Sequence, residues 1–358
     1  MTRMQIQLNR GAARGALAAA AVLALTAACS STGSGDDGSP DGAAGDSVFA
    51  ADGTLTIQLS YLKEVGYAGD YIAETDGYFE DEGFGKVDLI AGPTAVEAAV
   101  AAGNAEVGYT TPIGTASMVA NQDTPIRIVG VLEQRNAFTI MSLPGAGAIT
   151  EPADLIGTTI AVPEGTATII VQALLKANGI AADEVQLVPG IGNVGMISGG
   201  EVDGYFTFET SELVAIENGD VVSMPFADHG LPVSGLAYAV TTEAIENDRD
   251  AVKAFLVAEL RGWADAIDDP ELAVQLTMDT YGSDLGLDRA TQEARAQRFA
   301  DYLLPGGEGS LLLLTDEQIA GNLESLGDAG IDVAADDVFD MTLLQEIYQE
   351  HPDLQQAK

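Results

Sequence analysis

Cysteine and histidine are scarce in this sequence. Its 358 residues include one cysteine, Cys29, and two histidines, His229 and His351, which stand far apart. A single thiol excludes a disulfide within the chain and a cysteine-based metal cluster. Metal sites built from carboxylates alone stay open, but no spacing of the EF-hand kind occurs. We therefore expect neither a bound metal nor a cofactor.

Positive charge is also scarce. Only 15 Lys and Arg stand against 55 Asp and Glu, which gives a formal net charge of −40. A chain of this charge repels phosphate backbones, so nucleic acid is not an expected partner. The acids are dispersed along the chain, as on a solvated globular surface. Beyond the first thirty residues no apolar run is long enough to span a membrane.

Basic residues prevail only at the start of the chain. Arg3, Arg10 and Arg14 come first, with no acid among them. Residues 15–28 (GALAAAAVLALTAA) follow without a charge and are too short for a permanent membrane helix. A basic segment followed by a short apolar one is typical of an export signal.

The junction after this segment resembles the bacterial lipoprotein signal, in which the cysteine is acylated and becomes the first residue of the mature protein. Two small residues, Ala27 and Ala28, precede Cys29. That pattern prefers Leu three residues before the cysteine, and Thr26 stands there in this chain. An ordinary secretory signal with an incidental cysteine is the alternative. We predict a signal peptide over 1–28 and a lipid anchor at Cys29, on the outer face of the bacterial cytoplasmic membrane.

The next segment, residues 29–52, is rich in Ser, Gly and Asp and reads as a flexible tether. About 300 residues remain, enough for two lobes with their own cores. Strand and helix patterns alternate through them, which is typical of βαβ units and of an α/β fold with mostly parallel sheets. The predicted strands are 54–60, 86–91, 105–109, 158–162, 184–188 and 201–208, and the predicted helices are 68–80, 93–103 and 166–179.

Two stretches of the chain repeat one pattern. AAGNAEVGYTT (101–111) aligns with ISGGEVDGYFT (197–207). The shared positions are Gly103 with Gly199, Gly108 with Gly204, Tyr109 with Tyr205, and Thr111 with Thr207. Two copies of one α/β plan indicate two similar lobes.

The sequence predicts the division of the chain into lobes as follows. The first lobe takes residues 53–142 and the second takes 143–234. Residues 235–358 return to the first lobe, and a helical extension beginning near 243 packs back on it. The apolar segments 127–143 and 234–242 are the expected crossovers between the lobes.

Five segments in this order resemble the solute-binding proteins of ABC importers, in the branch named for sulfonate, nitrate and thiamine-pyrimidine-precursor binding. They are AGDYIAETDGYFEDEGF (68–84), GPTAVEAAVAAGNAEVGY (92–109), ITEPADLIGTTIAVPEGTATIIVQALLKANGIAADEVQLV (149–188), ISGGEVDGYF (197–206) and TTEAIENDRDAVKAFLVAELRGWADAIDDPELA (241–273). The resemblance implies the two-lobed, class II fold of periplasmic binding proteins. It also implies hinge strands near 140–145 and 232–238, closure on a small ligand, and docking on ABC permease subunits in the membrane.

Ligands of open α/β sheets lie at the carboxyl ends of strands, over helix N-termini. The candidate ligand-binding residues in these loops are Tyr61, Tyr67, Thr94, Tyr109, Thr110, Asn136, Thr166, Phe208, Glu209 and His229. Rings from facing lobes could clamp a flat heterocycle, and an acid such as Glu209 could accept hydrogen bonds from ring amino groups. The alternatives are that some tyrosines fill the core, that the threonines only cap helices, and that His229 has no special role.

We expect a binding protein that delivers a small, flat, nitrogen-rich ring, such as a thiamine pyrimidine precursor, to an importer. A flavin, a sulfonate or another organic solute on the same fold is the alternative, although Arg135 and Lys63 are the only cations in the candidate loops. An enzyme is the other class. The pyrimidine synthases of this fold use a cysteine-rich motif, and no cysteine follows Cys29. No catalytic residue is predicted.

Overall fold

The computed structural model describes residues 49, 53–92, 95–307 and 309–355. The predicted signal peptide, Cys29, the tether except for Phe49, and Thr94 lie outside the described residues. A search of the described residues finds no helix with both the length and the apolar character needed to cross a bilayer.

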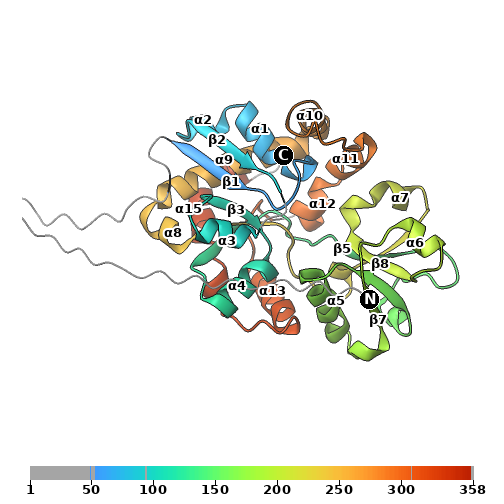
Figure 1. Ribbon diagram of the computed structural model, residues 1–358. Coiled ribbons are helices and arrows are strands. Elements are labelled where there is room, and N and C mark those ends of the chain that lie inside the picture. The colour runs from blue at the N-terminus through green and yellow to red at the C-terminus, as the bar shows by residue number, and fades with distance from the viewer. Residues whose placement is uncertain (1–48, 50–52, 93–94, 308, 356–358) are drawn as a thin grey trace, which may run out of the picture. The chain divides into compact units, whose positions relative to one another are not determined.

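The strands of the described chain form two mixed sheets of five strands each (Figure 1). They are β1 (Thr54–Gln58), β2 (Lys86–Ile90), β3 (Val107–Thr110), β4 (Ile126–Val131), β5 (Phe138–Ser142), β6 (Thr159–Val162), β7 (Gln186–Pro189), β8 (Gly204–Phe208), β9 (Val222–Pro225) and β10 (Ala237–Thr241). The first sheet has the order β2-β1-β3-β10-β4 and the second has β7-β6-β8-β5-β9. In each sheet three neighbouring strands are parallel and the fourth runs against them. The predicted α/β architecture is therefore confirmed.

The two sheets follow one plan, because β3 holds the same place in the first sheet as β8 in the second. These strands carry the two aligned stretches, and each begins beside a crowded glycine. A Cβ atom on Gly108 would lie 2.5 Å from Val96, and one on Gly204 would lie 2.9 Å from Ile140. The tyrosine after each glycine is fully buried. The internal repeat predicted from the sequence is thus a repeat of structure.

Helices flank both sheets. They are α1 (Ala68–Thr75), α2 (Tyr78–Asp81), α3 (Val96–Ala101), α4 (Pro112–Gln122), α5 (Thr166–Ala177), α6 (Val194–Ser198), α7 (Leu213–Glu217), α8 (Thr242–Asn247), α9 (Arg249–Asp268), α10 (Pro270–Leu276), α11 (Arg289–Ala296), α12 (Phe299–Leu303), α13 (Asp316–Asp328), α14 (Ala335–Val338) and α15 (Thr342–Glu350). The helix expected over 68–80 is interrupted between α1 and α2. Gly77 stands there with a φ of 80°, a left-handed conformation that glycine adopts without strain.

We call the first sheet with α1–α4, α8–α10, α14 and α15 the first lobe, and the second sheet with α5–α7 the second lobe. Helices α11, α12 and α13 contact both. Helix α11 packs on α7, and α13 packs on both α4 and α5. Lys176 in α5 also donates from Nζ to the backbone oxygen of Gly327 in α13, at 2.9 Å. The helical extension therefore differs from the expectation, since it bridges the lobes instead of packing on the first alone.

The chain changes sheet at residues 132–137 and 226–236. Strand β5 begins at Phe138 and pairs with β8, so the first change comes before the boundary at 142 and the hinge near 140–145. The physical reason is that 127–143 holds two apolar runs on either side of the polar residues 133–136, and periodicity does not tell which sheet each run joins. The second crossover overlaps the hinge expected near 232–238.

Helices α1 and α9 approach each other closely enough to require glycine on both. A Cβ atom on Gly262 of α9 would overlap the backbone of Gly69 in α1, and a Cβ on Gly69 would overlap the Trp263 ring. The contact buries the indole completely. Trp263 is therefore a packing residue of the α1–α9 contact.

We expect Gly262→Ala to lower the free energy of unfolding by roughly 1–3 kcal/mol, because the added methyl group overpacks the α1–α9 contact. Gly327→Ala is the matched control. It lies in α13, a Cβ there meets nothing within 4 Å, and alanine is the better helix former by about 1 kcal/mol. Chemical denaturation of both variants measures the difference. Equal effects of the two substitutions would contradict the close approach.

Candidate functional site

The two crossovers join the carboxyl ends of one sheet to those of the other. The first leaves Val131 at the end of β4 and reaches Phe138, which pairs with Phe208, the last residue of β8. The second leaves the end of β9 and reaches Ala237, which pairs with Thr110, the last residue of β3. Since both connections are short, the carboxyl edges of the two sheets face the crossovers. This edge is where open α/β sheets bind their ligands.

Large apolar side chains are exposed at these edges. In the first lobe, Tyr61 just after β1 is 54 % exposed and Ile90 at the end of β2 is 41 % exposed. In the second lobe, Ile191 just after β7 is 83 % exposed and Phe208 at the end of β8 is 46 % exposed. They make up half of the large hydrophobic residues that the described chain exposes. Exposed apolar side chains at the edge where open α/β sheets bind ligands are candidates for a surface that binds something apolar.

Sequence reasoning identified Tyr61 and Phe208 and missed Ile90 and Ile191. The two isoleucines also stand at strand ends, so their position in the sequence could have identified them as candidates. Their residue type could not, because an isoleucine at the end of a strand is usually part of the core. Phe208 is held in place by its own lobe, since its ring packs edge-on to Phe138 at 5.7 Å.

Three of the predicted ligand-binding residues lie in the core of the first lobe. Tyr67 is buried, and its hydroxyl group hydrogen-bonds to Ser60 Oγ at 2.9 Å. Tyr109 is fully buried with its ring edge-on to Tyr67 at 4.8 Å. Thr110 is buried too and donates to Glu97 Oε1 at 2.5 Å. These side chains offer no surface to a ligand here, and the alternative, that some tyrosines fill the core, describes Tyr67 and Tyr109.

Asn136 has a structural position between the crossovers. Its buried amide Nδ2 donates to the backbone oxygens of Leu231 at 2.9 Å and Val233 at 2.6 Å, so it ties the two connections together. Thr166 opens α5 directly after Gly165 and is exposed. His229 is half-buried, and its backbone oxygen accepts from Asn178 at 2.7 Å.

Glu209 is the one acid among the predicted ligand-binding residues. Hydrogen bonds fix the orientation of its carboxylate at the carboxyl edge of the second sheet. It follows β8 directly, in the 3-10 turn Glu209–Ser211, and is half-buried. One carboxylate oxygen accepts from Ser223 Oγ at 2.9 Å and the other accepts from the Tyr302 hydroxyl group at 3.2 Å. Each carboxylate oxygen has a second acceptor position, so the group can still receive a donor from a ligand.

The arginines near this edge already have carboxylate partners. Arg135 on the first crossover donates two hydrogen bonds, of 2.7 and 2.8 Å, to Asp228 on the second, and this contact lowers the pKa of Asp228. Arg295 of α11 forms an ion pair with Glu64, and both side chains are largely buried. Lys63 forms no ion pair with any described residue. An anionic ligand would therefore find its cations mostly neutralised.

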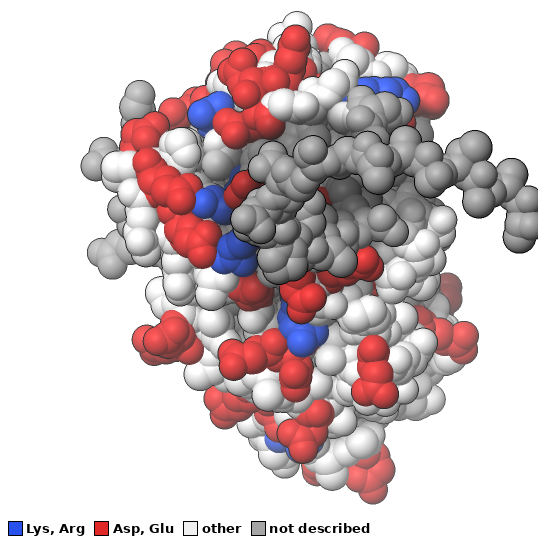
Figure 2. Space-filling model, turned by 90° about the vertical axis from the view of Figure 1, so that its left-hand side faces the viewer, with Lys and Arg blue, Asp and Glu red and all other residues white. Residues whose placement is uncertain are grey.

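The electrostatics of the wider surface agree with this. On the face shown in Figure 2, Asp and Glu side chains are spread over the described surface and far outnumber Lys and Arg. At the crossovers, burial raises the pKa of Glu133, partly offset by the charge of Arg295. Neither the surface nor the strand ends favour a phosphate or sulfonate group.

Two five-stranded mixed sheets, joined at their carboxyl edges by two crossovers, define the type II fold of the periplasmic binding proteins. Residues 65–273 match the family model described as NMT1/THI5 like, and the chain belongs to this family. The resemblance noted from the five segments is therefore confirmed at the level of this family.

Proteins similar to this chain are named for different ligands and activities. The riboflavin-binding protein RibY of Chloroflexus aurantiacus is 25 % identical over 278 residues, which cover 74 % of this chain and 79 % of RibY. The periplasmic aliphatic sulphonate binding protein SsuA of Escherichia coli superposes with a TM-score of 0.62 at 16 % identity, over 81 % of this chain and 91 % of SsuA. The desulfurization enzyme DSZB superposes with a TM-score of 0.56 at 14 % identity, over 83 % of this chain and 99 % of DSZB. The fold is thus shared by binding proteins and at least one enzyme.

A buried polar network lies below Tyr67, next to the candidate site. The Tyr109 hydroxyl group donates to Asp70 and lies 3.1 Å from the Tyr238 hydroxyl group, which donates to Glu259 at 2.5 Å. Trp263 Nε1 donates to the same Tyr238 oxygen at 2.8 Å. Asp70 Oδ1 and Glu259 Oε1 are buried and receive no hydrogen bond from another group.

Burial keeps the two carboxyl groups of this network protonated to a higher pH than an ordinary carboxyl group. Burial raises the pKa of Asp70 to about 7 and raises the pKa of Glu259 well above its usual value, and the two groups also affect each other. A proton on one carboxyl turns it into a donor for the other, which resolves both orphaned oxygens. The folded chain therefore binds protons that the unfolded chain releases.

The raised pKa values make the folded state less stable as the pH rises. A raised pKa in the folded state stabilises the fold fully below about pH 4, and the contribution is lost as the pH rises to about 7. We expect the Asp70 carboxyl group alone to cost the wild type on the order of 3 kcal/mol of unfolding free energy between pH 5 and pH 8. Asp70→Asn should flatten that slope, because the amide cannot ionise and can donate to Glu259.

Urea denaturation at several pH values measures this slope. Asp154→Asn is the control, since hydrogen bonds from the backbone of Thr150 and Glu151 lower the pKa of that exposed carboxyl and its contribution falls below pH 4. A slope that Asp70→Asn leaves unchanged would show that the buried pair is not proton-linked to folding.

Proposed function

We propose that this chain captures a flat, mainly uncharged heteroaromatic molecule with a flavin-like ring, between the carboxyl edges of its two sheets, and delivers it to an ABC permease. The observation that carries this proposal is the exposure of Tyr61, Ile90, Ile191 and Phe208 at those edges. Two of the four come from each lobe, so lobe closure would bury all of them against one guest. Burying an aromatic surface between them would drive binding.

The charges around the edges support an uncharged ring over an anion. Arg135 and Arg295 are already paired with Asp228 and Glu64, and freeing either arginine would leave a carboxylate without its partner. A sulfonate would have to bear that cost, whereas a neutral ring would not. Glu209 is suited to accept a hydrogen bond from a ring N–H or a ligand hydroxyl group.

The relatives support the flavin over the thiamine pyrimidine precursor that we expected first. RibY is named as a riboflavin-binding protein and shares 25 % identity with most of this chain. A three-ring flavin also has more apolar area to cover four exposed side chains than a single pyrimidine ring has. We therefore take riboflavin as the reference ligand.

We propose binding without catalysis. DSZB shows that the fold can carry an enzyme. The sequence, however, offers no cysteine after Cys29, and the large side chains exposed at the facing edges are apolar. The partners we propose are the ligand and the permease subunits. Cys29 and the tether would hold the protein on the outer face of the cytoplasmic membrane.

Titration with riboflavin tests this proposal. At a hundredfold excess over its dissociation constant, the ligand should add about 2.7 kcal/mol of stability, visible as a higher melting temperature. Nitrate, an alkanesulfonate and an aminopyrimidine serve as competing probes. A melting temperature that rises with the sulfonate and not with riboflavin would show that the ligand class is wrong.

Variants of the exposed rings test the site itself. Tyr61→Ala and Phe208→Ala should each weaken riboflavin binding roughly 5- to 30-fold, since each removes an aromatic contact of about 1–2 kcal/mol. Ile156→Ala is the matched control, because Ile156 is as exposed as Tyr61 but stands before β6, at the opposite edge of its sheet. Calorimetric titration of the three variants gives the comparison. An equal loss in the control would remove the argument for the facing edges.

A further inference from the structure

Helix α11 is fixed to the first lobe by buried polar contacts. Gln292 is buried, and its Oε1 accepts from the backbone N–H of Val65 at 2.9 Å. Arg295, one turn further, forms the ion pair with Glu64. A Cβ atom on Gly66 would come within 2.6 Å of Arg295 Nη2, so the helix lies directly on this turn. Buried hydrogen-bonded contacts of this kind are costly to break.

Helix α12 continues this attachment. Phe299 packs edge-on to Trp263 of α9 at 5.3 Å. The backbone oxygen of Tyr302 accepts from the N–H of Arg135 on the first crossover at 3.1 Å. Together α11 and α12 therefore belong mechanically to the first lobe.

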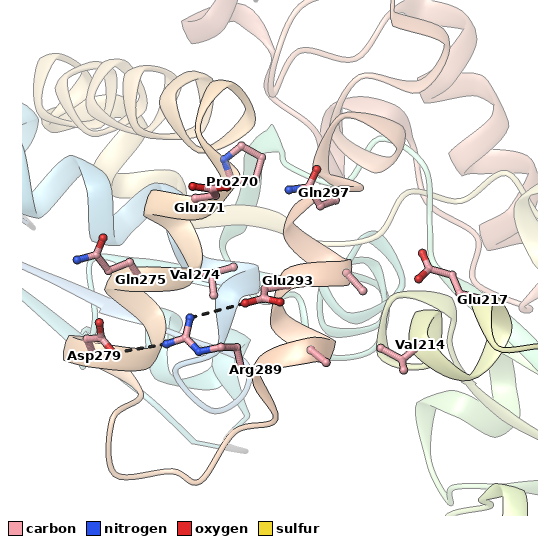
Figure 3. A pocket seen from close by; sticks show the side chains of 12 residues that line it. Val214, Glu217, Pro270, Glu271, Val274, Gln275, Asp279, Arg289, Glu293 and Gln297 are labelled. Carbon is pink, nitrogen blue, oxygen red and sulfur yellow. Dashed lines mark ion pairs between the residues drawn. The ribbon is translucent and has the colours of Figure 1, made fainter.

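Toward the second lobe, α10 and α11 face an open groove of about 880 Å³ (Figure 3). Val214 and Glu217 of α7 line one side of it. On the other side Arg289 makes ion pairs within its own wall, with Asp279 at 3.6 Å and Glu293 at 3.8 Å. No ion pair crosses the groove between the residues that line it. The packing of α11 on α7 is therefore not reinforced by charge across the groove.

One hydrogen bond does join α11–α12 to the second lobe among the described residues, from the Tyr302 hydroxyl group to Glu209 Oε2, at 3.2 Å. Tyr302 is buried, and burial together with the charge of Glu209 raises the pKa of its hydroxyl group, so it stays a donor at neutral pH. Glu209 is held from its own lobe by Ser223 on β9. The carboxylate thus has one donor from each lobe.

We propose that Tyr302 is a positioning residue, whose hydroxyl group holds the Glu209 carboxylate toward the first lobe and thereby restrains the opening of the two lobes. The proposal rests on the proposed function in one respect, since it treats Glu209 as the acid that accepts from the ligand. Its mechanical part depends only on the contacts of α11 and α12. Removal of the hydroxyl group should release the second lobe while the attachment to the first lobe persists.

The distance between the lobes tests the mechanical part without any ligand. Spin labels at Glu80→Cys in α2 and Asp183→Cys near β7 mark one exposed site on each lobe, in a chain with Cys29→Ser so that no other thiol is present. Tyr302→Phe should shift the distance distribution to longer values or broaden it. The same distribution as in the unsubstituted chain would overturn the proposal.

Tyr348→Phe is the matched control. Tyr348 is also buried, and its hydroxyl group donates to the backbone oxygen of Leu311 at 2.7 Å, within contacts of α15 that do not involve the second lobe. Its loss should lower the melting temperature about as much as Tyr302→Phe does. It should leave the distance between the labels unchanged, and a shift in both variants would show general loosening instead of a specific restraint.

Riboflavin affinity tests whether Tyr302 acts through Glu209. Tyr302→Phe should weaken binding roughly 5- to 20-fold, as expected for a lost hydrogen bond to a charged group that orients it. Combined with Glu209→Gln, it should add little to the effect of Glu209→Gln alone, because both changes remove one interaction. Additive effects would overturn the proposal. If the unsubstituted chain binds no riboflavin, the proposed function is wrong, and the label distances still decide the role of Tyr302.

Discussion

The structure depends on one topological constraint: both crossovers connect carboxyl edges. If β4 led to the amino edge of the second sheet, the exposed side chains of the two lobes would point away from each other. The pairing of Phe138 with Phe208 and of Ala237 with Thr110 prevents this, because each crossover then starts and ends beside the loops that follow the parallel strands. A ligand surface shared by two lobes is a direct consequence of those two registers.

The excess of negative charge shapes that surface as much as the apolar residues do. A chain with 55 acids can keep a buried arginine only by pairing it, and Arg295 lies between Glu64 and the neighbouring Glu133 for this reason. Each ion pair that stabilises the crossovers also leaves one cation fewer to bind an anionic ligand. Apolar burial remains as the main source of affinity, which agrees with the kind of ligand that the exposed side chains favour.

Much of the fold was predictable, because strand alternation and helix periodicity are local signals. The strands around 54–60 and 86–91 and the helix over 166–179 are present with the predicted first residues and with last residues one or two positions earlier. The sheet to which β5 belongs was not predictable, since it depends on long-range pairing. The same limit applies to the site. Tyr61 and Tyr109 both stand at strand ends, yet Tyr61 is exposed and Tyr109 is buried beside Asp70, a contact across 39 residues.

The helical extension shows why the rest of the site lies beyond sequence reasoning. Nothing in the pattern of residues 287–304 indicates that Gln292 and Arg295 would face the turn after β1, more than 200 residues earlier. Once they do, the extension adds to the first lobe a wall on which α7 of the second lobe packs, and a hydrogen bond to Glu209 joins this wall to the second lobe. The buried amide contact and the buried ion pair of the wall both lie on the side of the first lobe, so movement of the second lobe need not break them. We propose that Glu209, which links the lobes, also accepts a hydrogen bond from the ligand. Lobe movement and ligand recognition would then depend on the same carboxylate.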